Sequence, residues 1–157
     1  MPKLFLDLDG VLADFDSGFA ALYAGERRGL PDAELWRIVG THPDFFDALT
    51  PMTDALDLFE AVRHLDPIIL TACPRSLYEW ACIGKSRWVG RVLGAEIRVI
   101  TVKGGRNKPL HMTGPGDVLI DDWAVNIAAW EKAGGVGIHH VDATGSLRAL
   151  AACGILS

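Results

Sequence analysis

Short apolar runs alternate with longer amphipathic stretches along the chain, and this alternation is typical of repeated strand–helix–strand units. Each run is too short for an ordinary helix and is rich in Val, Ile, Leu or Phe, as buried parallel strands are. The five runs span residues 3–8, 67–71, 97–102, 118–121 and 136–141. They predict an α/β fold built on a parallel sheet.

The stretches between these runs carry apolar residues at three- and four-residue steps, so they predict helices. Asp54 is a candidate N-cap for the first of them, which extends to Leu65. Two more helices are expected over residues 76–93 and 123–133, each ending near a glycine, and a last one over residues 146–152.

The interval from Asp14 to Leu65 is too long for a single crossover helix. It contains an apolar helix candidate over residues 15–23, a turn rich in Gly and Arg, and a second short helix over residues 32–39. We interpret residues 14–65 as a small helical cap inserted after the first strand of one domain that covers residues 1–157.

Composition narrows the class of protein. Of the 157 residues 50% are hydrophobic and 22% are charged, which predicts a packed core. The net charge of −5 argues against tight binding to long nucleic acids, although a single phosphate could still be held locally. The three cysteines are scattered and the chain has no apolar run long enough to cross a membrane. We therefore expect a cytoplasmic enzyme with reduced thiols and no membrane partner.

Asp7 and Asp9 stand two residues apart where the first predicted strand ends, and Gly10 follows at once. Residues i and i+2 of an extended chain point to the same side, so both carboxylates can face one pocket. In open α/β sheets that pocket lies beyond the carboxyl ends of the strands. Two carboxylates so close repel each other unless a cation or a shared proton stabilises them. The alternative interpretation is a strand that ends in an ordinary polar turn.

Later strand ends add to the same edge of the predicted sheet. One apolar run ends in Thr71, another ends in Asp121-Asp122, and Lys108 follows a third after a short polar loop. Carboxylates, a hydroxyl and an amine together match the needs of phosphoryl transfer: a nucleophile, oxygen ligands for a hard cation, and donors for phosphoryl oxygens.

In this order, the motifs DxDG, a strand ending in Thr, a Lys and a DD pair resemble the haloacid dehalogenase-like phosphatase superfamily. Within it, the run DLDGVLADF at residues 7–15 is most similar to the 5′(3′)-deoxyribonucleotidases, and residues 78–89 resemble the segment after their second motif, where a Gly-x-Lys-x-x-Trp pattern leads a helix. The resemblance spans about residues 3 to 125. It departs from the family at Ala72, where a second hydroxyl is common, and at Trp123, where a basic residue is frequent.

This resemblance implies a Rossmann-like three-layer core with a helical cap, and a Mg²⁺-dependent phosphatase acting on (deoxy)nucleoside monophosphates. Asp7 would attack phosphorus to form an aspartyl-phosphate, and Asp9 would act as acid and then as base. The Mg²⁺ ligands would come from Asp7, Asp9 and the pair Asp121 and Asp122. Thr71, Lys108 and Arg75 would bind the phosphate.

Several assignments stay open at this point. Lys103 is an alternative to Lys108, and Asn126 either supports the metal site or lies on a helix surface. Asp14 and Asp16 are expected at a helix start rather than in catalysis, and His139-His140 is expected to be structural. The aromatic residues of the cap either contact the substrate or form the core of the cap; they are Phe15, Phe19, Trp36, Phe45 and Phe46.

Other functions remain to be weighed. A 3′-phosphatase acting on nucleic-acid ends and a phosphatase of another small metabolite use the same chemistry. A non-catalytic scaffold that keeps the fold is a further alternative, which the intact acid motifs disfavour. The expected partner is a small phosphomonoester, and the oligomeric state, a homodimer included, is left open.

Overall fold

The computed structural model describes residues 1–25 and 27–156, and a five-stranded parallel sheet forms its centre. The strand order is β3-β2-β1-β4-β5. The strands are β1 (Leu4–Leu6), β2 (Ile68–Cys73), β3 (Val99–Lys103), β4 (Val118–Asp121) and β5 (Val136–His139). The predicted α/β fold with a parallel sheet is therefore confirmed. Each strand lies within, or within two residues of, an apolar run in the sequence.

Alternate residues of the strands pack on opposite faces of the sheet, which creates two layers of core. Leu4 and Leu6 of β1 belong to the larger core cluster, whereas Phe5 between them belongs to the smaller one. The ring of Phe5 meets that of Trp130 edge-on, with the centroids 5.2 Å apart. Because both faces are buried, every residue of β1 is apolar.

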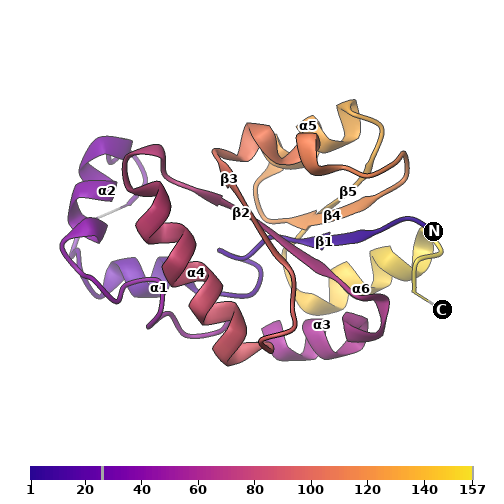
Figure 1. Cartoon of the computed structure of the whole chain (residues 1–157), viewed down its shortest axis with the longest axis horizontal. Helices are drawn as coiled ribbons and strands as arrows, with labels where there is room; N and C mark the ends of the chain where they lie inside the picture. Colours follow the sequence, from indigo (N-terminus) through magenta and orange to yellow (C-terminus); the bar gives the residue numbers. More distant parts are fainter. Residues whose placement is uncertain (26, 157) are drawn as a thin grey trace.

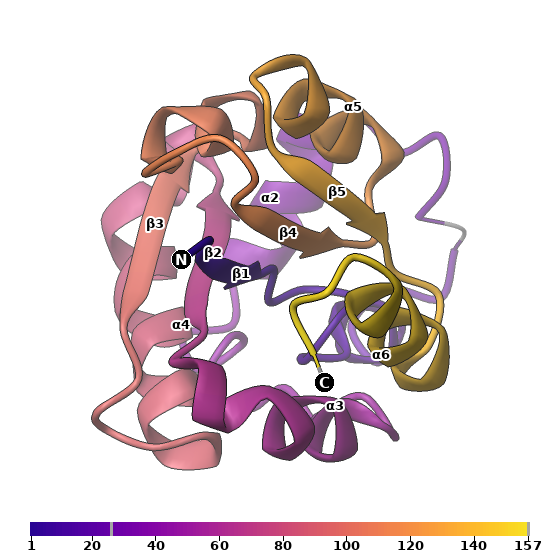
Figure 2. The same ribbon diagram turned by 90° about the vertical axis from the view of Figure 1, so that its right-hand side faces the viewer.

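Helices cover the two faces of the sheet (Figures 1 and 2). The larger cluster joins the sheet to α3 (Ala55–Val62), α4 (Tyr78–Val92) and α6 (Ala143–Ala152). The smaller cluster includes Ile127 and Trp130 of α5 (Ala124–Lys132), beside which lies the 3-10 helix η3 (Gly105–His111). Two further 3-10 turns, η1 (Arg63–Leu65) and η2 (Arg75–Leu77), join β2 to α3 and α4. Among the described residues, no helix has the length and apolar character needed to cross a membrane.

Two short helices, α1 (Phe15–Ala20) and α2 (Asp32–Gly40), lie at the end of the sheet opposite the two chain termini (Figure 1). Asp14 caps α1, since its side chain accepts a hydrogen bond from the Ser17 N–H at 3.0 Å. The prediction that Asp14 starts a helix is thus confirmed.

Helix α3 falls outside this group, because it packs beside α6 beneath the sheet. The Asp54 side chain does not cap α3 as the sequence suggested; it accepts a hydrogen bond from the Ala143 N–H at the start of α6, at 2.6 Å. The nearby N-terminus of a second helix offers Asp54 a partner that no local pattern could reveal. We propose that the inserted cap comprises residues 14–53 rather than 14–65.

Candidate active site

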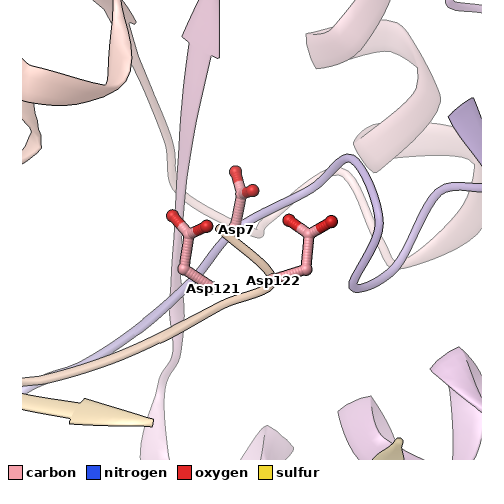
Figure 3. A group of neighbouring side chains, drawn as sticks. All are labelled: Asp7, Asp121 and Asp122. Atoms are coloured by element: carbon pink, nitrogen blue, oxygen red, sulfur yellow. The ribbon is translucent and has the colours of Figure 1, made fainter. Parts of the chain in front are cut away.

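Three carboxylates meet where β1 and β4 end (Figure 3). Asp7 follows β1, Asp121 is the last residue of β4, and Asp122 comes next in the chain. One oxygen of each of these side chains lies within 4.8 Å of the others. Such a set of oxygen atoms is what Mg²⁺ prefers in proteins. The adjacent strand ends bring it together, because β1 and β4 pair directly in the sheet.

Lys108 supplies the countercharge inside the protein. Its Nζ lies 2.8 Å from Asp7 Oδ1 and 2.6 Å from Asp121 Oδ2, and all three side chains are buried. Burial alone would lower the pKa of Lys108, but the two carboxylates raise it above its ordinary value. Burial and the neighbouring Asp121 raise the pKa of Asp7, while Lys108 opposes them. One lysine charge thus faces several carboxylates.

The two acids of the DD pair have different surroundings. Asp121 Oδ1 accepts from the Trp123 N–H at 2.8 Å, and Oδ2 accepts from Lys108 and from Asn126 Nδ2, the latter at 3.0 Å. Apart from the backbone N–H of Asp122 itself, no group in the described part of the chain donates a hydrogen bond to the Asp122 carboxylate. Burial, with repulsion from Asp7 and Asp121, raises the pKa of Asp122 to about 7. Asp122 is therefore the carboxylate left free for a ligand, and Asn126 supports Asp121.

Gly10 permits the close approach of Asp122. Its φ of +82° lies in the left-handed region, where glycine is at no disadvantage. A Cβ built at this position would overlap the Asp122 carboxylate. The glycine of the DxDG motif is thus required both for the turn and for the space that the carboxylate occupies.

Asp9 is held by Lys85, which lies in the segment that resembles the family but to which the sequence assigned no role. Lys85 Nζ donates to Asp9 Oδ2 at 2.6 Å, to the Ala72 carbonyl at 2.6 Å and to Thr71 Oγ1 at 3.1 Å. Asp9 Oδ1 is buried and has no partner among the described residues. Lys85 lies on the buried side of α4, with Ala81 and Trp88. A lysine on an apolar helical stripe was the signal that could have identified it.

The residues predicted to bind the phosphate differ in how close they lie to the cavity beside Asp7 and Asp9. Thr71 is fully buried two residues before the end of β2 and does not line the cavity beside Asp7 and Asp9, whereas the next residue, Ala72, does. Of the two candidate lysines, Lys108 reaches Asp7, whereas Lys103 is exposed and lies over the ring of Tyr78. Arg75 is exposed at the start of η2 and does not line that cavity. The structure thus does not bring Arg75 to the site, because the η2 turn directs it to solvent.

A cavity of about 300 Å³ opens over the carboxylates, between the sheet edge and the cap. Of the five aromatic candidates, Phe15 and Trp36 line it, and their rings meet edge-on with centroids 5.9 Å apart. Phe19, Phe45 and Phe46 do not line it and are buried in the core of the cap. Phe45 and Phe46 thus occupy packing positions, since a small cap must bury its own apolar surface, whereas Phe19 also lines a neighbouring cavity.

The histidine pair does not form a metal site in the structure. The Nε2 atom of His139 lies 3.0 Å from the Asp122 carbonyl, and Nδ1 of His140 lies 2.8 Å from Ser146 Oγ. The two imidazole rings therefore contact different groups. Asp16 lies exposed on α1 and forms an ion pair with Arg27 at the rim of the cavity.

The chain is similar in sequence to named deoxyribonucleotidases. It is 32% identical to the human 5′(3′)-deoxyribonucleotidase of the cytosolic type, over 76% of this chain and 70% of the human protein. Relatives from Bordetella bronchiseptica and Vibrio phage KVP40 provisionally carry the same enzyme name and are 31% and 32% identical, with 73% and 68% of their lengths covered. No model of a protein family matches the chain.

Solved structures share the fold at low identity. L-2-haloacid dehalogenase from Xanthobacter autotrophicus superposes with a TM-score of 0.56 at 14% identity, over 99% of this chain and 84% of that one. A hydrolase from Streptococcus pneumoniae gives a TM-score of 0.53 at 13% identity, over 95% of this chain and 97% of that one. The structures thus show that the chain has the fold of haloacid dehalogenase-like hydrolases, and the sequence identity to the human enzyme shows the family: the chain belongs to the 5′(3′)-deoxyribonucleotidases, and it is a phosphatase.

Proposed function

We propose that this phosphatase is a Mg²⁺-dependent nucleotidase that hydrolyses (deoxy)nucleoside monophosphates through an aspartyl-phosphate on Asp7. The observation that carries the proposal is the cavity above Asp7 and Asp9, which opens directly onto the carboxylate cluster. A nucleophile, an acid–base group and a cation site thus share one cavity of about 300 Å³.

Asp7 is the proposed nucleophile. One of its oxygens forms the new bond to phosphorus as the bond from phosphorus to the leaving oxygen breaks. Lys108, 2.8 Å from Asp7 Oδ1, keeps the carboxylate in place and offers positive charge to the phosphoryl group. The buried Thr71 hydroxyl accepts from Lys85 and so helps to anchor this lysine beside Asp9.

Asp9 is the proposed acid and base. Lys85 holds its Oδ2, whereas the buried Oδ1 has no protein partner in the described part of the chain and is available for proton transfer. Asp9 gives a proton to the leaving alkoxide in the first step. In the second step it takes a proton from the water that attacks phosphorus, which restores the Asp7 carboxylate and releases phosphate.

The carboxylates fit a hard divalent cation. Asp122 and Asp7 would hold the cation. Asp121 would stay behind them, where Lys108 and Asn126 donate hydrogen bonds to its carboxylate. The excess of negative charge in this cluster favours binding of a cation. When bound, Mg²⁺ would reduce the repulsion between the Asp7 carboxylate and the phosphate dianion. This assigns Asp122 as the direct acidic ligand of the DD pair.

The nucleotide as substrate is supported by family membership and by the two aromatic residues of the cavity. Trp36 is half-buried close to the carboxylates and offers a ring on which a nucleobase stacks well, and the buried Phe15 packs edge-on against it. The names of the relatives state deoxyribonucleotides, so deoxynucleoside monophosphates are the first substrates to examine.

Phosphate release should be measured with and without Mg²⁺ over a panel of 5′- and 3′-deoxynucleotides, ribonucleotides, sugar phosphates and a 3′-phosphorylated oligonucleotide. We expect Mg²⁺-dependent release, fastest with the deoxynucleotides. Preference for the oligonucleotide would identify a 3′-phosphatase of nucleic-acid ends instead, and preference for sugar phosphates would identify another metabolite phosphatase.

A further inference from the structure

Trp123 is a large aromatic side chain exposed beside the carboxylate cluster. It is 59% exposed, whereas Trp88 and Trp130 are buried. Its backbone is fixed, because the Trp123 N–H donates to Asp121 Oδ1 at 2.8 Å and the residue forms the N-cap of α5. The backbone of Trp123 is therefore held next to Asp121 and Asp122, and its ring lies beside them at the cavity.

Two cavities meet at this ring. The cavity over the carboxylates has a volume of about 300 Å³, and a neighbouring one of about 620 Å³ lies against the cap. Trp36 and Trp123 line both, together with Arg27, Asp16 and Asp122. A cavity near the small end of the range for ligand sites holds a phosphate and a sugar more readily than a whole nucleotide. The rest of the substrate would have to pass Trp123.

We propose that Trp123 is a specificity-determining residue that contacts the base of the nucleotide as it extends toward the second cavity, an inference that rests on the proposed function. The indole ring offers a π face to any base, and Trp36 faces the same space from the cap. The phosphate site is built from other residues, so Trp123 acts on the organic group alone.

The test compares a deoxynucleoside 5′-monophosphate with 2-deoxyribose 5-phosphate, which keeps the phosphate and sugar but lacks the base. We expect Trp123→Ala to lower kcat/KM for the nucleotide about tenfold, mainly through KM, and to leave the sugar phosphate unchanged. Trp123→Phe should restore most of the loss. Val125→Ala is the matched control, because Val125 is 55% exposed on α5 and lines neither cavity.

Equal losses on both substrates, or no loss on either, would overturn the role of Trp123. Wild-type protein that hydrolyses the sugar phosphate as well as the nucleotide would also overturn it while leaving a phosphatase in place. Wild-type protein that hydrolyses neither would contradict the proposed function itself.

A second and independent feature is a pair of cysteines next to Lys85. Cys73, the buried last residue of β2, and Cys82 of α4, which is half-buried, have their Sγ atoms 3.5 Å apart, and both are free thiols. Cys82 precedes Lys85 by three residues on the same helix, so the two side chains share a face. Cys73 follows Ala72, whose carbonyl accepts from Lys85 Nζ at 2.6 Å.

We infer that Cys73 and Cys82 form a redox-sensitive pair whose oxidation by a peroxide displaces Lys85 and thereby lowers the activity. In the first step the Cys82 thiolate attacks hydrogen peroxide, which gives a sulfenic acid and hydroxide. Cys73 then attacks the Cys82 sulfur, a disulfide forms and water leaves. Overall, two thiols are oxidised by two electrons, and one peroxide is reduced to two waters.

The geometry explains both the order of the steps and their effect. Cys82 is reached from solvent, while burial raises the pKa of the Cys73 thiol to about 12, so Cys73 is the residue that resolves rather than starts the reaction. A disulfide shortens the distance between the two sulfur atoms from 3.5 Å to about 2.05 Å, and so moves the side chains of Cys73 and Cys82 at the point where Lys85 is anchored.

The experiment treats Mg²⁺-supplied protein with hydrogen peroxide, removes the peroxide with catalase, and measures both the mass and the hydrolysis of p-nitrophenyl phosphate. We expect a loss of two hydrogens, a fall in activity of at least about fivefold, and recovery with dithiothreitol. Cys82→Ser should start with wild-type activity and resist the treatment. Cys153→Ser, which removes the exposed cysteine after α6, should respond like the wild type. Inactivation of Cys82→Ser to the same degree, or a disulfide without loss of activity, would overturn the inference.

Discussion

At the scale of single residues, the site is organised by two buried lysines that face different acids. Lys108 neutralises Asp7 and Asp121, and Lys85 holds Asp9. A buried ammonium group persists only where carboxylates and carbonyls compensate for its lost hydration, so each lysine also orders the acids around it. The proposed nucleophile, Asp7, and the proposed acid–base residue, Asp9, thus each have a lysine of their own.

Replacing Lys85 by Met should lower kcat by about 10- to 100-fold, the range in which general acid–base catalysis begins, because Asp9 loses the donor that orients it. KM should change little, since Lys85 does not line the cavity. The pH profile of kcat should shift as well, which a merely structural role of Lys85 would not cause. Lys103→Met is the matched control, since Lys103 is exposed over Tyr78. Unchanged kcat and pH profile in Lys85→Met would contradict the positioning role.

The residues that could be predicted from the sequence are those that strands deliver. Asp7 and Asp121 follow apolar runs, and parallel strands end at one edge, so their meeting was foreseeable. Lys85 and Asn126 come from helices, and Lys85 is 76 positions from Asp9, so only tertiary packing could reveal their partners. The cap aromatics could not be sorted from the sequence, because core and cavity positions share one helical spacing.

At the scale of elements, polar side chains tie the ends of strands and helices to one another. Asp54 joins α3 to the N-terminus of α6, and Asp117 joins the start of β1 to the turn before β4. The helices and strands themselves followed from apolar periodicity. Lys108, expected after an open polar loop, lies within η3, which turns it inward. The inward position of Lys108 depends on its ion pairs with Asp7 and Asp121, which are far away in the sequence. The local sequence pattern therefore does not predict it.

Asp117 provides a test at this scale. It is almost fully buried and accepts hydrogen bonds from the N–H groups of Lys3, Thr113 and Gly114 and from the Thr113 hydroxyl. Burial alone would raise its pKa, but these hydrogen bonds lower it below the ordinary value. Its contribution to stability is therefore present at neutral pH and is lost as the pH falls through the folded-state pKa, below about 4.

Asp117→Asn should lower the free energy of unfolding at pH 7 by about 1–3 kcal/mol, because an amide presents a donor to groups that also donate. Chemical denaturation at pH 7 and at pH 3 gives the measurement, and the difference from wild type should shrink at the lower pH. Asp57→Asn, at an exposed position of α3, should have little effect at either pH. A difference that grows on acidification would contradict this account.

At the scale of the whole molecule, the fold gathers negative charge at one end. The carboxylate cluster lies at the carboxyl edge of the sheet, in a protein whose net charge is already −5. The cap stands over this edge, while the chain termini lie at the other end (Figure 1). A cation that binds the cluster therefore relieves repulsion that the folded state otherwise retains.

Saturating Mg²⁺ should raise the melting temperature, since a ligand held about 100-fold above its Kd stabilises the folded state by about 2.7 kcal/mol, or several degrees for a domain of this size. Asp122→Asn should abolish the rise. It should also melt slightly higher than wild type without Mg²⁺, because one repulsive charge is gone. Asp57→Asn should keep the full rise, and thermal melts monitored by circular dichroism would record all three. A full rise in Asp122→Asn would exclude Asp122 as a ligand.

The central claim is that Asp7 carries the phosphoryl group during turnover. The direct measurement is rapid acid quenching of enzyme mixed with Mg²⁺ and a deoxynucleoside monophosphate, followed by mass spectrometry of the peptide that contains Asp7. We predict a phosphoryl adduct on Asp7 that hydroxylamine removes. The adduct should be more abundant in Asp9→Asn if this change slows the second step more than the first. It should be absent from Asp7→Asn, which should still fold. Active enzyme that never carries the adduct, or an Asp7→Asn variant with substantial turnover, would contradict the account.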